Sequence, residues 1–136
     1  MQFLYVGAKN AIQKFQDPDW DQVYSALKSI NKKEGRTYVK LQHEVSESYV
    51  MCYGSKRALL IEYYDAENQS FLLGEGIEKP VETLIQGSAG PVRVHLNEIL
   101  AVANAYDVFE FFHRANTIPS RYSLRAKQTQ LELQNL

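Results

Sequence analysis

The apolar positions of the chain change their spacing twice, and each spacing predicts a different kind of element. Between residues 20 and 30 they recur every three or four positions, which predicts an amphipathic helix with Trp20 in the core. We expect Asp17 to cap this helix, because proline, here Pro18, is favoured at the first helical position. Gly35 is expected to stop it. The predicted apolar stripe consists of Trp20, Val23, Tyr24, Leu27 and Ile30.

From residue 36 to residue 96, alternating positions and short apolar runs replace the helical spacing, as is typical of strands. Short segments that contain Gly, Asn or Ser separate the runs, and connections this short favour antiparallel hairpins. The predicted strands are residues 38–43, 49–53, 58–64, 70–73, 81–85 and 92–96, and residues 122–124 offer a further edge strand.

A second helix is predicted between Asn97 and Arg114, with Asn97 as its cap. Its apolar face is wide, which indicates a helix packed across a sheet, and Pro119 prevents its continuation. Residues 128–136 are expected to form a frayed tail. The chain thus predicts one α+β domain over residues 1–136: a mostly antiparallel sheet of about five to six strands, with an N-terminal helix and a longer C-terminal helix packed on it.

Composition narrows the functional classes. The 136 residues carry 15 basic and 16 acidic side chains, and this balance is not that of a general nucleic-acid or membrane-surface binder. A single cysteine, Cys52, excludes an internal disulfide framework and suits a reducing compartment. No apolar run has the length of a secretory signal core or a membrane span. We therefore expect a cytoplasmic protein, with a monomer favoured.

No motif for catalysis, a metal or a cofactor stands out in the sequence. His43, His95 and His113 lie far apart, and none belongs to an H-x-x-x-H pair. Cys52 lies within an apolar strand and is interpreted as a small buried hydrophobic residue. Neither a G-x-S-x-G elbow nor a phosphate-binding loop is present. We therefore predict a protein that is not an enzyme and needs no cofactor or metal.

The near-zero net charge hides an uneven distribution. Six acids and one base, Lys79, lie between residues 62 and 82, whereas residues 114–127 hold four bases and no acid. Such blocks are common on solvated loops, and they also fit an acidic surface that steers a basic partner. Tyr63 and Tyr64 lie in the acidic region and must face opposite ways if the segment is a strand.

Motifs spread along most of the chain carry a family resemblance. They are Trp20-x-x-Val23-x-x-Ala26-Leu27, the strand end Met51–Gly54, the basic-then-apolar run 57–63, Gly87, Val94-x-Leu96-x-x-Ile99, Phe111-Phe112 and Asn116-x-x-Pro119. Together they resemble the bacterial polymorphic-toxin immunity proteins of the first numbered immunity family, the Imm-one family. The resemblance implies a protein that binds and neutralises a cognate toxin domain, often a nucleic-acid-targeting enzyme such as a deaminase or nuclease.

A toxin that acts on a polyanion carries basic surface, which an acidic immunity protein would occupy. Charge and expected exposure therefore select the candidate toxin contacts. They are Glu62, Tyr64, Asp65, Glu67, Glu75, Glu78 and Glu82.

Two other classes stay open. One is a small-ligand-binding or enzymatic domain with a pocket between the sheet and the last helix, lined by Tyr53, His95 and Tyr106. The other is an oligomerisation module that uses an exposed edge of the sheet. A filled interface between sheet and helix would count against the first class, and a concentration-independent monomer against the second.

Overall fold

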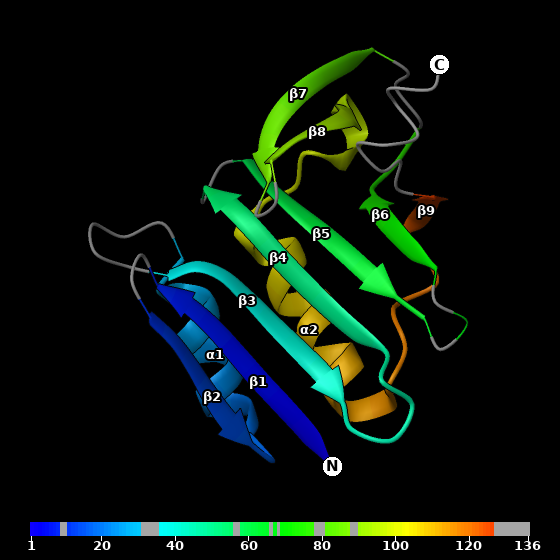
Figure 1. Ribbon diagram of the computed structural model, residues 1–136. Coiled ribbons are helices and arrows are strands. Elements are labelled where there is room, and N and C mark those ends of the chain that lie inside the picture. Colours follow the sequence, from blue (N-terminus) through cyan, green and yellow to red (C-terminus); the bar gives the residue numbers. More distant parts are fainter. Residues whose placement is uncertain are drawn as a thin grey trace.

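An antiparallel sheet with both helices on one of its faces forms the body of the protein (Figure 1). The computed structural model describes residues 1–8, 11–30, 36–55, 58–65, 67, 69–77, 81–87 and 90–126. The predicted stop at Gly35 and the predicted tail at residues 128–136 lie outside these ranges.

The main sheet has seven strands in the order β2-β1-β3-β4-β5-β6-β9, and every neighbouring pair is antiparallel. A separate two-stranded hairpin, β7–β8, stands over one end of the sheet (Figure 1). The strands are β1 Gln2–Ala8, β2 Ala11–Gln16, β3 Arg36–His43, β4 Tyr49–Ser55, β5 Ala58–Tyr64, β6 Ser70–Gly74, β7 Glu82–Gly87, β8 Gly90–His95 and β9 Ser123–Ala126. The α+β class and the antiparallel sheet are as predicted.

Strand alternation gives the sheet two differently covered faces. Leu59 and Ile61 of β5 pack with the helices α1 (Trp20–Lys28) and α2 (Val102–Ala115) in the larger core cluster. Leu60, between them, points the other way and packs with Val94 of β8 in the smaller cluster beneath the hairpin. The helices thus cover one face, and the hairpin covers part of the other.

Among the described residues the main sheet has seven strands, compared with the five to six predicted, and two further strands form the separate hairpin. The difference is mainly the N-terminal hairpin β1–β2, which the spacing did not reveal. The predicted strands between residues 38 and 96 all occur, with shifts of one or two residues at several ends. The predicted edge strand corresponds to β9, which pairs with β6.

Both helices begin later than predicted. Asp19, rather than Asp17, caps α1: its carboxylate accepts a hydrogen bond from the Gln22 amide, and the Gln22 side chain accepts one from the Asp19 amide. Asn97 lies in the short 3-10 helix η1 (Leu96–Glu98), so it does not cap α2. Leu100, after η1, pairs with Leu59 of β5 before α2 starts at Val102.

The buried face of α2 fits the prediction of a helix packed across a sheet, since Ala105, Val108, Phe109 and Phe112 are all fully buried. Trp20 is only half-buried at the border of the larger cluster, where its ring lies beside Tyr24 and His113.

Candidate functional site

The six candidate toxin contacts that the structure describes do not form one acidic face. Glu62 is 3% exposed and points from β5 toward the face that carries Tyr53, so the expectation of an exposed side chain is wrong for this residue. Asp65 and Glu67 follow the end of β5, whereas Glu75 follows the opposite end of β6. Glu82 belongs to β7 of the separate hairpin, and Glu78 lies outside the described residues.

Several charges that form blocks in the sequence are paired in space. Arg121, from the basic C-terminal block, contacts Asp107 at 2.6 Å, and Arg125 contacts Glu98 at 2.7 Å. The pKa of Arg121 is raised, mainly through its hydrogen bond to Tyr122 and less by the charges of Asp107 and Glu75. The folded surface is therefore less segregated in charge than the sequence indicated.

The three residues of the alternative pocket do not line one cavity. Tyr53 belongs to the smaller cluster under the hairpin, whereas Tyr106 packs from α2 against the larger cluster on the opposite face. His95 ends β8, where its ring lies 3.7 Å from Glu82. Buried side chains of the larger cluster fill the space between the sheet and α2. This arrangement counts against the predicted pocket.

The other polar side chains that could support catalysis are held in structural contacts. Cys52 is fully buried, as predicted, and this burial raises the pKa of its thiol. His113 Nε2 donates to the Pro18 carbonyl at 2.7 Å, and His43 Nδ1 accepts from the Ser46 amide at 3.2 Å. Both histidines line an open hollow of about 430 Å³. Within the described ranges, no three His, Cys, Asp or Glu side chains are grouped to hold a metal ion.

The part of the sheet face that the hairpin leaves uncovered carries a cluster of aromatic rings and lysines. We call it the aromatic–lysine face, and it consists of Phe3, Tyr5, Lys14, Lys40, Tyr49 and Tyr64. Strand register brings these residues together. Lys14, Tyr5 and Lys40 lie side by side on β2, β1 and β3, and Tyr49 lies opposite Tyr64 on β4 and β5.

The rings and ammonium groups of this face contact one another. The Tyr49 and Tyr64 rings stack with centroids 4.9 Å apart and planes 8° from parallel. The Lys40 ammonium lies 4.1 Å from the centroid of Tyr49, and that of Lys14 lies 4.6 Å from the centroid of Phe3. Partial burial lowers the pKa of Lys40, and burial, followed by the charge of Glu62, raises the pKa of Tyr49.

None of the four aromatic residues of this face belongs to either core cluster. All four are half-buried: Phe3, Tyr5, Tyr49 and Tyr64. Large aromatic rings that lie outside the core are typical of the centre of a protein-binding surface. Of the six residues of this face, only Tyr64 was among the candidates predicted from the sequence. Phe3, Tyr5 and Lys14 were missed because no strand was predicted in the first sixteen residues, whereas Lys40 and Tyr49 lie on predicted strands but were not selected as contacts. The alternation Phe3-x-Tyr5 beside Leu4-x-Val6 was the available signal.

No protein-family model matches the chain, and no curated protein matches it either. Among the described residues, neither helix is long and apolar enough to cross a membrane.

Proposed function

We propose that this protein is a non-enzymatic immunity protein, which binds a cognate toxin domain in the cytoplasm and so blocks its activity. The family resemblance implies the kind of partner, a toxin domain that often acts on nucleic acids. The observation that carries the binding role is the aromatic–lysine face, a group of half-buried rings that neither core cluster uses.

The chemistry of this face favours a protein partner over a single-stranded nucleic acid. Bases stack on free ring faces, but here Tyr49 and Tyr64 stack on each other, and Lys14 lies over Phe3. A protein partner instead needs apolar area, ring edges and a few charges at the rim. Lys14 on β2 and Lys40 on β3 provide positive charge on this face, in contrast to the acidic surface that the sequence predicted.

Two of the acidic candidates adjoin this face and keep a place in the proposal. Asp65 and Glu67 directly follow Tyr64 at the end of β5. The Asp65 carboxylate accepts hydrogen bonds from the Glu67 and Gln69 amides at 2.9 and 3.1 Å, so it shapes the loop, while Glu67 is exposed. Glu75 follows the far end of β6 and Glu82 lies on β7 of the separate hairpin, so neither is proposed as a contact of this face.

The test is co-expression of this protein with the toxin domain encoded by the adjacent reading frame. Protection of the cells is the expected result, and equally fast killing with and without this protein would contradict the proposal. With the purified domains, the double variant Tyr49→Ala, Tyr64→Ala should bind the toxin at least about 30-fold more weakly, because central aromatic residues contribute about 2 kcal/mol or more to the binding free energy.

A matched control is Tyr24→Ala, which removes a tyrosine from α1 that is 38% exposed and lies away from the aromatic–lysine face. Its affinity for the toxin should equal that of the unchanged protein. If both sets of variants protect cells and bind equally well, the toxin uses another surface and the assignment of this face is wrong.

A further inference from the structure

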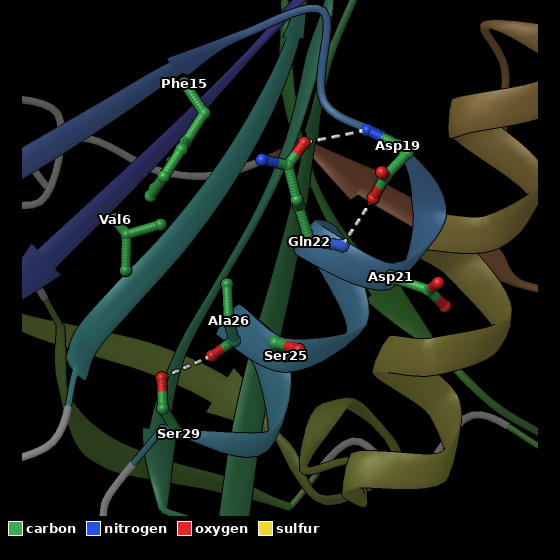
Figure 2. Close-up of a pocket in the computed structure, with 8 residues that line it drawn as sticks. All are labelled: Val6, Phe15, Asp19, Asp21, Gln22, Ser25, Ala26 and Ser29. Carbon is green, nitrogen blue, oxygen red and sulfur yellow. Dashed lines mark hydrogen bonds between the residues drawn. The ribbon is translucent and has the colours of Figure 1, made fainter.

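A second surface lies at the edge of the sheet, where β2 and α1 flank a groove of about 370 Å³ (Figure 2). Its apolar lining comes from Val6 and Ala26, which are buried, and from Phe15, which is 36% exposed. Figure 2 shows Phe15 and Val6 projecting from the strands toward the face of α1 that carries Gln22 and Ala26. The groove therefore combines an apolar floor with an adjoining strand edge.

That strand edge is unusually open. β2 is the outermost strand of the sheet in the described structure, and all six of its residues are exposed. An edge strand presents every second amide and carbonyl outward, and proteins commonly protect such edges by shortening, proline or bulges. The other edge strand, β9, has only four residues, whereas β2 contains no proline and pairs with β1 in unbroken register.

The polar lining of the groove is acidic. Asp19 and Gln22 are engaged in the cap of α1, and the Ser29 hydroxyl donates to the Ala26 carbonyl at 2.7 Å. Asp21 also lines the groove, although Figure 2 shows its carboxylate on the side of α1 away from Phe15 and Val6, and it forms neither a hydrogen bond nor an ion pair within the described part of the chain. Among the described residues that line the groove, none is basic. A basic side chain of a ligand would therefore meet a complementary charge.

We propose that β2 and this groove bind an extended peptide segment of a partner protein as an additional strand. The peptide backbone pairs with the outer edge of β2, and its alternate side chains enter the groove against Phe15 and Ala26. The segment that fits carries apolar residues at alternate positions and a lysine or arginine near Asp21. The groove lies on the helix side of the sheet, opposite the aromatic–lysine face, although both surfaces include residues of β2.

The probe is a capped, fluorescent peptide of about eight residues that alternates valine with threonine and carries a lysine near each end. Its anisotropy with the full chain measures affinity, and NMR-detected hydrogen exchange locates binding. We expect slower exchange at alternate amides of β2, because only every second amide faces the added strand. The same peptide with alternate backbone nitrogens methylated keeps its side chains but cannot pair, and it should not bind.

Phe15→Ala should weaken binding of the lysine peptide about tenfold, whereas Leu84→Ala should leave the affinity unchanged. Leu84 is the matched control, since it is an exposed apolar strand residue that lies on β7 of the separate hairpin. Asp21→Asn should weaken binding of the lysine peptide about threefold. The same substitution should have a smaller effect on binding of a peptide that carries glutamate in place of lysine.

Three results would overturn this proposal: no binding at millimolar peptide, equal binding of the methylated peptide, or a protein dimer that Phe15→Ala dissociates. The last would show that a second copy occupies the edge. The Tyr49→Ala, Tyr64→Ala protein should bind the peptide normally, so failure of the toxin proposal and failure of this one are distinguishable.

Discussion

The ion pair between Glu98 and Arg125 provides a sharp test of how the C-terminal strand is held. Glu98 is 3% exposed, and its carboxylate accepts two hydrogen bonds from the Arg125 guanidinium, at 2.8 and 2.7 Å. It also accepts one from the His95 amide at 2.7 Å. The pair therefore joins β9 to η1. Arg125→Met keeps the apolar stem but leaves a buried carboxylate without its counter-charge.

Removing one partner of a buried pair typically costs 3–5 kcal/mol. The Arg125 side chain is 27% exposed and the His95 amide stays in place, so we expect the lower limit, about 3 kcal/mol, for Arg125→Met. Adding Glu98→Gln removes the unpaired charge. The double variant should therefore regain about 2 kcal/mol relative to Arg125→Met alone.

Urea unfolding followed by circular dichroism measures these free energies. Arg114→Met is the matched control, because Arg114 pairs with Glu110 on the surface of α2, with side chains 61% and 46% exposed. It should cost no more than about 0.5 kcal/mol. Two results would contradict this expectation: a loss of stability for Arg125→Met as small as that of the control, or a double variant that is no more stable than Arg125→Met.

Two further predictions concern Gly54 and Cys52. Gly54 has φ +117°, and an added Cβ would collide with the Ala58 carbonyl, so Gly54→Ala should lower the free energy of unfolding by about 2 kcal/mol or more. Gly76 has φ +74° but faces open space, so Gly76→Ala should cost only about 1 kcal/mol. Equal losses for the two variants would contradict the steric explanation. Burial raises the pKa of Cys52 in the folded protein, so above the ordinary thiol pKa of about 8.5 the unfolded chain ionises first. This difference should contribute a fall of about 1 kcal/mol in the free energy of unfolding between about pH 8.5 and 9.5, so the fall that urea titrations measure should be smaller by this amount in Cys52→Ala.

The sequence predicted the central strands well because each has one or both faces buried. Val39 and Leu41 of β3, and Val50 and Cys52 of β4, are fully buried on one face, and this burial is the origin of the two-residue alternation. β2 is different, since all its residues are exposed and its only described strand partner is β1. Its stability depends on backbone pairing, which leaves a weak signal in the pattern of apolar residues.

The helix starts were mispredicted for local reasons. Both Asp17 and Asp19 are good capping residues, but only Asp19 has a glutamine three positions later to complete a capping box. Asp17 instead adopts φ +48°, and its amide donates to the Gln2 carbonyl at the base of the N-terminal hairpin. Asn97 does not cap α2 because Leu100, three positions later, pairs with Leu59 of β5, and this pairing interrupts the helical segment.

The acidic region could not be converted into a surface from sequence alone. Neighbouring positions in an antiparallel sheet point to opposite faces, and the two ends of one strand are separated by its length. Because of this alternation Glu62 is buried, and the length of β6 separates Asp65 from Glu75. Arg121 forms an ion pair with Asp107, and the charge of Glu75 also acts on it. These arrangements depend on strand order, which charge counts along the chain do not contain.

Tyr63 and Tyr64 illustrate how the fold separates structural from binding roles. Tyr63 packs against the larger core cluster under the helices, so its ring contributes to folding. Tyr64, one position later, faces the other side, where it stacks on Tyr49 and belongs to neither cluster. The β7–β8 hairpin covers Leu60 and Leu72 on this side. Because neither core cluster includes Tyr49 or Tyr64, loss of these two rings should affect recognition of a partner far more than stability.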